Sequence, residues 1–478
     1  MDYTPNATSD SRRITTRFAF LAEALNGNGG FAPLVNMDSD LSGMKKPVRV
    51  ASYCHLVPYP RENAQKFAAR AAVAVYENHL RSACENFTGY IARRKPQRDT
   101  GANPLFDRMV DDADWAGNNL DVFWQSFMLD AKARGSMLLL IEMPSEQGMN
   151  QADTLNRRLV PYLTAISPDR LCDYRLNERK QFAWVRISDN NYWNGRETIA
   201  VERYWDDRQW RVYQGNIILE QGPHNFGQCP VLAFTELGAY PCVGEFAQIA
   251  DLSKRIYNAR SELDEILRGQ TFSVLAYQVP QEQRNVYQSL ADSISATIGT
   301  NNMLVHEGLT PSFIAPPDGP ATIYGQVIDA LHESISRIGY SVQQHQTSKA
   351  QESGLSLVVR FQSLNGALSR FARRMQDLEM RMWSIAGAAL GMNVIPTAQW
   401  ATDYSIADTE RELAILTAMQ ATGFPERALI EQRKHIASET FGSLDESELF
   451  EVMAAIEEAE QETAAVPGQS QTDGGALP

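Results

Sequence analysis

The sequence lacks the segments that mark membrane and secreted proteins. Across its 478 residues, no apolar run approaches the ~18 residues that a membrane-spanning helix needs, and the best run is Met137 to Ile141. Residues 1–13 are polar and contain no apolar signal segment, so we expect no secretion. The five cysteines are widely spaced and form no CxxC motif. This usage indicates reduced thiols in a cytosol and argues against a disulfide framework or a zinc site.

Recognisable catalytic and metal-binding motifs are also absent. The chain contains no GxxxxGK(S/T), GxSxG or HExxH motif, and none of its seven histidines has a second ligand at metal-binding spacing. Asp112 and Asp114 resemble the DxD motif of metal-dependent sugar transferases, but Asp just before a helical segment also supplies N-terminal capping. We therefore predict no enzyme, cofactor or metal site. A metal-dependent transferase that uses Asp112 and Asp114 is kept as an alternative.

Negative charge is concentrated near the C-terminal end. Residues 403–478 contain 16 acidic and 4 basic side chains, a net charge of −12 out of −14 for the whole chain. Such a region repels nucleic acid, unless its role is to let nucleic acid slide past without adhering. A solvated helical surface is the alternative interpretation. The overall composition, 44% hydrophobic and 21% charged, is that of a globular protein.

Three apolar ladders at helical spacing are the strongest positive signal. The longest runs from Leu357 to Ala389 in alternating steps of four and three residues. This pattern predicts a helix about 50 Å long with one continuous apolar stripe. Shorter ladders run from Ile249 to Ile266 and from Tyr324 to Val342. Any single ladder is typical of a core helix, but three in succession, with the longest too long for a compact domain, favour packing between copies of the chain.

The segments around the ladders show other patterns. The predicted elements are a helix over 61–93, a helix from Asn118 or Asn119 to Gly135, a buried strand at 137–141, an antiparallel meander rich in Trp and Tyr within 161–236, a small α/β insertion at 271–320 with strands at 272–277 and 302–306 and a helix at 281–296, and helices over 403–462. The basic side chains of the first helix, Arg70 among them, are expected on a solvated face.

Several short motifs, taken in this order, resemble those of tailed-phage portal proteins. That family forms the ring at a capsid vertex through which DNA enters and leaves. The motifs are Arg61 to Arg70, Gly89 to Pro96, Asp112 to Asp114, Leu139 to Pro144, Gln228 to Val231 and Glu352 to Gly354. Their order, together with two ladders that flank an inserted module, is more specific than any one motif. The resemblance covers roughly residues 60 to 460.

The resemblance implies an α+β architecture with named parts. These are a β-rich wing at 1–243, long stem helices at 244–270 and 321–344, a small α/β clip inserted at 271–320, a tunnel loop at 345–356, a long helix with the return to the wing at 357–402, and an acidic helical crown with a flexible tail at 403–478. The stem ladders would then pack between neighbouring subunits. The residues expected at that contact are Leu252, Ile256, Leu263, Leu331, Ile335 and Ile338.

The resemblance also implies a function and partners. The chain would form a homo-oligomeric ring, usually of twelve copies, around a channel for DNA packaging and ejection. The implied partners are double-stranded DNA, the terminase large subunit, the major capsid protein and a head–tail adaptor, with no membrane. The implied location is the portal vertex of the virion, after synthesis in the host cytoplasm. The loop residues expected to face the DNA are Gln346, Ser348, Lys349 and Gln351.

The basic content of the expected tunnel loop and an alternative class of protein also bear on this resemblance. Lys349 is the single basic residue of the expected tunnel loop, so we do not expect that loop to grip DNA strongly. A different coiled-coil virion or scaffolding protein would share the three ladders. Such a protein would need neither the aromatic meander nor the inserted module.

Overall fold

The computed structural model describes most of the chain as two separate units, Met1–Thr402 and Asp403–Pro478. The described residues are 9–32, 35–39, 45–50, 54–60, 62–144, 151–238, 240–271, 274–278, 303–306, 312–314, 319–340, 354–404, 416–423, 425–440 and 451–456. None of the helices within these stretches is long and apolar enough to cross a membrane. The α+β class predicted from the sequence is confirmed.

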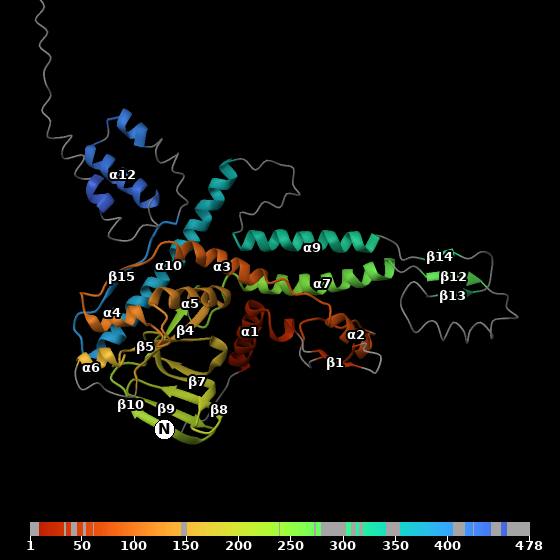
Figure 1. Cartoon of the computed structure of the whole chain (residues 1–478), viewed down its shortest axis with the longest axis horizontal. Coiled ribbons are helices and arrows are strands. Elements are labelled where there is room, and N and C mark those ends of the chain that lie inside the picture. Colours follow the sequence, from red (N-terminus) through yellow and green to blue (C-terminus); the bar gives the residue numbers. More distant parts are fainter. Residues whose placement is uncertain are drawn as a thin grey trace, which may run out of the picture. The chain divides into compact units, whose positions relative to one another are not determined.

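The first unit begins with five helices, which Figure 1 shows in red to orange. They are α1 (Ser9–Asn26), α2 (Ala64–Ala71), α3 (His79–Ala92), α4 (Pro104–Asp111) and α5 (Leu120–Arg134). The predicted bounds of α5 are confirmed, and its ends show why. The Asn119 side chain accepts a hydrogen bond from the Val122 amide, and Gly135 ends the helix in the left-handed conformation, at φ 81°.

The single helix predicted over 61–93 is wrong, because the chain breaks between α2 and α3. Asn78 has two roles there: its Oδ1 caps α3 by accepting from the Arg81 amide, and its Nδ2 donates to the Leu25 carbonyl at 2.7 Å. Tyr76 likewise donates to the carbonyl of Ala24 at 3.1 Å. Residues 72–78 therefore satisfy the carbonyl end of α1, and this is incompatible with a continuous helix.

Arg70 is also not on a solvated face. It is buried and donates from Nε and Nη2 to the two carboxylate oxygens of Glu62, at 2.9 and 2.7 Å. Burial disfavours the charged guanidinium, but the hydrogen bond to Glu62 and the negative charges nearby together outweigh it and raise the pKa of Arg70. Helical periodicity does not reveal a buried arginine, because a charged side chain is normally assigned to the exposed face. Charged residues are rarely buried unless they are paired, as Arg70 is with Glu62.

Two antiparallel sheets stand at the centre of the first unit. A three-stranded sheet has the order β11-β4-β5, and the predicted meander is confirmed as a five-stranded sheet in the order β10-β9-β8-β7-β6. Their bounds are β4 (Ser136–Glu142), β5 (Tyr162–Ile166), β6 (Leu171–Leu176), β7 (Phe182–Trp193), β8 (Thr198–Trp205), β9 (Gln209–Gln214), β10 (Ile217–Pro223) and β11 (Val231–Thr235). Leu138 and Leu140 share a buried cluster with Val185, Ile187 and Trp205, which joins the two sheets.

Both units contain further elements among the described residues. They are β1 (Val35–Ser39) with β2 (Lys45–Val50), β3 (Gln97–Asp99) with β15 (Thr397–Gln399), α6 (Gln151–Asn156), α7 (Ala247–Thr271), β12 (Val274–Gln278), β13 (Met303–His306), β14 (Ser312–Ile314), α9 (Gly319–Ile338), α10 (Gly354–Leu390) and, in the second unit, α12 (Glu426–Thr440). β12 pairs in parallel with β13 and antiparallel with β14. The helix predicted at 281–296 lies outside the described residues.

The long ladder forms α10, but most of its apolar stripe faces the same chain. Leu368, Phe371, Met375, Met382 and Ile385 are buried, and α10 contacts β11, β4, β15 and α3. The Phe371 ring lies 5.1 Å from that of Phe234 and 5.7 Å from that of Phe87. The expectation that this ladder packs against another copy is therefore wrong for the part after residue 363. Periodicity identifies a buried face without identifying what buries it.

A buried lysine joins α5 to α3 and to the segment between β11 and α7. Lys132, at the end of α5, is 1% exposed, and its Nζ lies 2.5 Å from Glu236 Oε1 and 3.5 Å from Glu245 Oε2. The same ammonium lies 4.1 Å from the ring centroid of Phe87 in α3 and 4.0 Å from that of Phe246. Charge pairing and cation–π contacts together offset the cost of burying this group.

We predict that Lys132→Ala destabilises the first unit strongly. Removing one partner of a buried ion pair costs about 3–5 kcal/mol, because the remaining charge loses its compensation. The free energy of unfolding, measured in urea, should fall by that amount. Lys66→Ala is the matched control, since Lys66 is exposed and lies 3.6 Å from Glu265. Its cost should stay below about 1 kcal/mol. Equal losses in the two variants would contradict this account.

Candidate assembly interface on the α7–α9 helix pair

The helices α7 and α9 lie side by side and run in opposite directions (Figure 1). Tyr324, early in α9, donates to Glu262 Oε2, late in α7, at 2.5 Å. Tyr340, just after α9, donates to Glu245 Oε1, just before α7, at 2.9 Å. The hydrogen bond to Glu262 and partial burial raise the pKa of Tyr324 to about 12, so its hydroxyl remains a donor at neutral pH. These two bonds fix the register of the pair.

The six residues predicted at a subunit contact lie on this pair, but they are not equally accessible. Ile256, Leu331 and Ile335 are buried within the single chain, the latter two at 7% exposure. Leu252, Leu263 and Ile338 are half-buried. Leu331 and Ile335 thus need no second chain to cover them, and their role between subunits stays a prediction. Apolar side chains that do remain exposed on the pair are Leu267, Ile323 and Val327.

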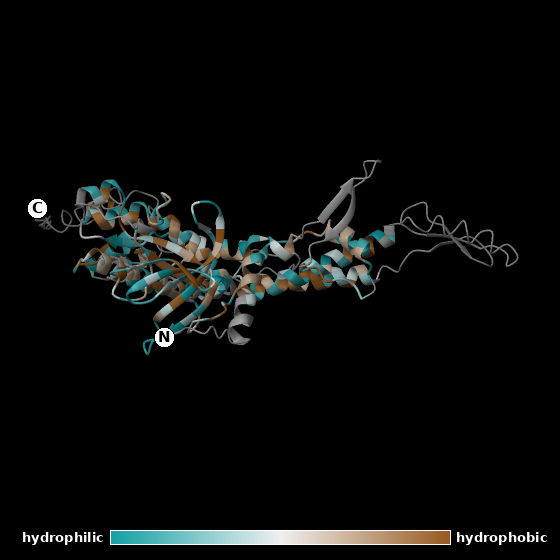
Figure 2. Ribbon diagram, turned by 90° about the horizontal axis from the view of Figure 1, so that it is seen from below, coloured by the Kyte–Doolittle hydropathy of each residue, from teal (hydrophilic) through white to brown (hydrophobic). Residues whose placement is uncertain are grey.

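A groove runs along one face of the pair. One face of α7, two residues of α9 and one residue from the segment before α2 line it. These residues are Asp251, Lys254, Arg255, Asn258, Ala259, Glu262, Val327, Leu331 and Val57. Val57 and Val327 are exposed apolar residues, and the lining also contains charged residues of both signs. Protein–protein interfaces commonly combine apolar side chains with polar and charged ones in this way. Figure 2 shows brown hydrophobic residues alternating with teal hydrophilic ones along both helices.

Contacts with the N-terminal segments hold this face in place. Asn258 Oδ1 accepts from the Val57 amide at 2.7 Å, and its Nδ2 donates to the His55 carbonyl at 3.1 Å. Arg17 donates from both terminal nitrogens to Asp251, each at 2.7 Å. Sequence reasoning missed Val57 and Asn258, because about 200 residues separate them and no local pattern links them.

The predicted channel residues Gln346, Ser348, Lys349 and Gln351 lie outside the described residues. Asp112 and Asp114 are described, and they organise the loop between α4 and α5. Asp112 accepts from the Gly117 amide at 2.9 Å and pairs with Arg158 at 3.0 Å. Asp114 accepts from the Ala116 amide and from Asn118. The interpretation of Asp112 and Asp114 as N-terminal caps of the next helix is therefore wrong, since Asn119 caps α5.

The hydrogen bonds at Asp114 also account for its ionisation. Burial opposes its charge, but the bonds from Asn118 and Ala116 outweigh that effect and lower its pKa. Both acceptor oxygens of Asp114, like those of Asp112, are already used within the protein. This arrangement gives no support to a metal-dependent transferase.

Comparisons with known proteins give weak similarities only. No family model and no curated protein matches the chain. Among solved structures, a chain in the neck of a native gene transfer agent (GTA) particle, computed with C12 symmetry, is 12% identical over 75% of this chain and 89% of that chain, with a TM-score of 0.43. A chain in the virion of a native GTA particle is 13% identical over 73% and 87%, with a TM-score of 0.40. These values do not establish a shared fold.

We predict that replacing both Leu331 and Ile335 with Asp separates α9 from α7 within the single chain. Each buried carboxylate lacks a partner there, which costs several kcal/mol. Limited proteolysis should then cut within α7 or α9, and thermal unfolding should acquire an early step, while the β-sheet core melts as before. An unchanged digestion pattern would show that this face is solvent-exposed and that the register is wrong.

Proposed function

We propose that this chain is a portal-type subunit of a tailed phage or phage-like particle. Its copies form a closed ring at one capsid vertex, and double-stranded DNA passes through the ring during packaging and ejection. The ring docks the terminase large subunit, the major capsid protein and a head–tail adaptor. The parts correspond to the wing, stem, clip, tunnel loop and crown of that family, within the bounds given from the sequence.

One observation carries the proposal: an antiparallel pair of long helices interrupted by a separate small sheet. The chain leaves the β-rich part at residue 246, follows α7, forms the sheet of β12, β13 and β14, and returns along α9 to α10. This order of elements is the one that the portal-like motifs imply. The register of the pair, fixed by Tyr324 and Tyr340, supports a rigid stem rather than two independent helices.

The exposed surface of the pair supports assembly into a ring. Ring closure needs two different complementary surfaces on each subunit, because neighbours meet head to tail. The groove with Val57 and Val327 is one such surface. Ile323 lies one helical turn before Val327 on α9, and these two are 60% and 42% exposed. Exposed apolar residues grouped in this way mark interaction sites.

The acidic C-terminal region fits a channel through which DNA moves. Residues 403–478 carry a net charge of −12, and repulsion of phosphate reduces adhesion of DNA that slides past. This proposal needs residues 403–478 to face the channel. The same charge on an outer surface would serve solubility alone.

We predict that the purified protein forms a ring of roughly twelve 53.4 kDa chains, about 640 kDa in total. Light scattering should give this mass, and electron images should show a central hole. Ile323→Asp combined with Val327→Asp should abolish the ring, because charge is placed where a neighbour covers apolar side chains, while the fold of each chain is unchanged.

The exposed Val394 supplies the control for ring assembly. Val394→Asp places one such charge, where the α9 double variant places two, at an exposed apolar residue outside the α7–α9 pair, and rings should persist. A stable wild-type monomer or dimer at micromolar concentration would refute the proposed ring. A small elongated oligomer would instead support the coiled-coil virion or scaffolding alternative. Rings that survive both stem substitutions would remove this face from the interface.

A separate prediction concerns the expected tunnel loop. Lys349→Ala should leave folding and assembly unchanged, because a polar loop contributes little to any core. If one Lys349 from each subunit faces the DNA, many weak phosphate contacts add up, and the variant should alter packaging or retention of DNA. Normal genome length and normal retention in particles with Lys349→Ala would indicate that Lys349 pairs with Glu352 on a solvated loop instead.

A further inference from the structure

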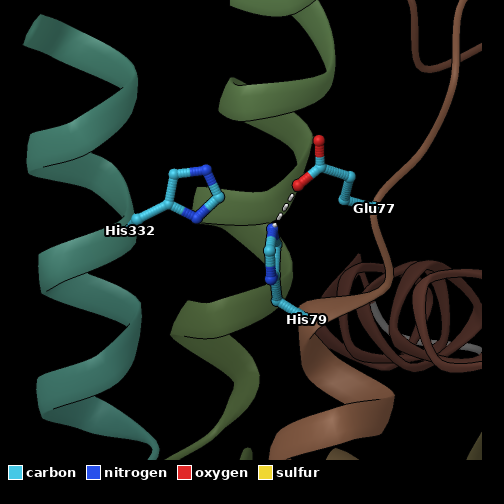
Figure 3. Close-up of side chains that lie close together, drawn as sticks. All are labelled: Glu77, His79 and His332. Atoms are coloured by element: carbon cyan, nitrogen blue, oxygen red, sulfur yellow. Dashed lines mark ion pairs between the residues drawn. The ribbon is translucent and has the colours of Figure 1, made fainter. Parts of the chain in front are cut away.

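Three side chains that bind metals in other proteins meet where the α7–α9 pair contacts the start of α3. Glu77 and His79 come from the segment that enters α3, and His332 comes from the middle of α9. One ligand atom from each of the three lies within 4.8 Å of the others. Figure 3 shows Glu77 and His79 facing each other, with the His332 ring projecting towards them from α9. The two imidazole centroids are 4.9 Å apart, with the rings at 82°.

The contact between Glu77 and His79 is not a good hydrogen bond. His79 Nε2 lies 3.3 Å from Glu77 Oε2, beyond the 2.7–3.2 Å range of ordinary N–H···O bonds. This nitrogen is buried and makes no hydrogen bond with any described residue. A buried polar atom that lacks a good hydrogen bond costs about 1–3 kcal/mol, so a group that binds both His79 and Glu77 would be better accommodated here than their ion pair alone.

The same distance matches two ligands of one metal ion. Zinc binds imidazole nitrogen and carboxylate oxygen at about 2.0–2.1 Å in tetrahedral geometry, which places neighbouring ligand atoms about 3.3 Å apart. Two histidines with one carboxylate form a ligand set that zinc uses elsewhere, with the fourth position held by water. Imidazole nitrogen suits Zn²⁺, Co²⁺ and Ni²⁺ and does not suit Mg²⁺ or Ca²⁺.

The surroundings of Glu77 orient its carboxylate towards the histidines. Arg260, on α7, forms an ion pair with Glu77, with its Nη1 2.8 Å from Oε1, while Oε2 is the oxygen nearest His79 Nε2. Ligating carboxylates are commonly held by a second, outer partner of this kind. The Arg260 guanidinium also balances part of the charge of Glu77. A divalent ion at the site would therefore connect α9 directly, and α7 through Arg260, to the segment before α3.

We propose that Glu77, His79 and His332 bind one divalent transition-metal ion of the zinc class, which clamps α9 to the entrance of α3. The sequence analysis predicted no metal site, because His332 follows His79 by more than 250 residues. The inference is independent of ring formation, since all three ligands belong to one chain.

The test is a titration of the full-length, chelator-treated protein with Zn²⁺. Calorimetry should show one Zn²⁺ per chain, and Zn²⁺ should raise the thermal unfolding temperature. His332→Ala should weaken binding at least about 100-fold, more than loss of an outer-shell partner does. His435→Ala is the matched control, because His435 is an exposed histidine in the second unit, and it should bind Zn²⁺ as the wild type does.

Further measurements keep the inference open to refutation. Glu77→Gln preserves the shape of the side chain and should also weaken binding, so the test does not depend on one variant. Thermal unfolding without metal verifies that both variants fold. Co²⁺ spectra reveal thiolate ligands by their charge-transfer absorption. The inference is overturned by an absence of saturable binding up to millimolar Zn²⁺, by equal affinity in His332→Ala and wild type, or by thiolate absorption with Co²⁺.

Discussion

The buried ammonium of Lys132 is the contact on which the first unit depends. It lies at the end of α5, between the carboxylates of Glu236, which follows β11, and Glu245, which precedes α7. The rings of Phe87 and Phe246 cover it. One charge thus ties the central sheet, the α3 helix and the start of the α7–α9 pair together. Because a buried charge is stabilising only when all its partners are present, this junction forms as a whole or not at all.

The backbone at this junction is equally constrained. Gly135 ends α5 and touches Gly244 before α7 so closely that a methyl group on Gly135 would lie 1.9 Å from the Gly244 nitrogen. The Gly244 amide donates to the Arg134 carbonyl at 3.0 Å, and the Glu236 amide donates to the Gly135 carbonyl at 2.8 Å. Both glycines are needed for these two segments of the chain to approach each other so closely. The direction in which α7 leaves the sheet is therefore set by backbone contacts and cannot adjust freely to a partner.

The sequence predicted the secondary-structure elements well, but it did not predict which parts of the chain pack against one another. Asn119 and Gly135 mark the ends of α5 by local chemistry, and the aromatic meander follows from alternation over a few residues. The break at Asn78 was missed because its hydrogen bond to Leu25 is a long-range contact. The stripe of α10 was detected, but a 3.5-residue repeat does not distinguish a partner copy from the chain's own sheet. The groove residues Val57 and Asn258, and the meeting of His79 with His332, depend on tertiary structure alone.

The apolar stripe of α10 is buried within the chain, so most of it is not available for an interface between copies. Once α10 packs on β11 and Leu331 and Ile335 pack against α7, few large apolar side chains remain on the helix pair. The groove combines the exposed Val57 and Val327 with the charged residues Asp251, Lys254, Arg255 and Glu262. Charges of both signs at a rim contribute more to register and partner choice than to affinity. A ring built on this face would therefore gain its stability from repetition of a modest contact around a closed circle, with the rigid junction at Lys132 keeping every copy at the same angle.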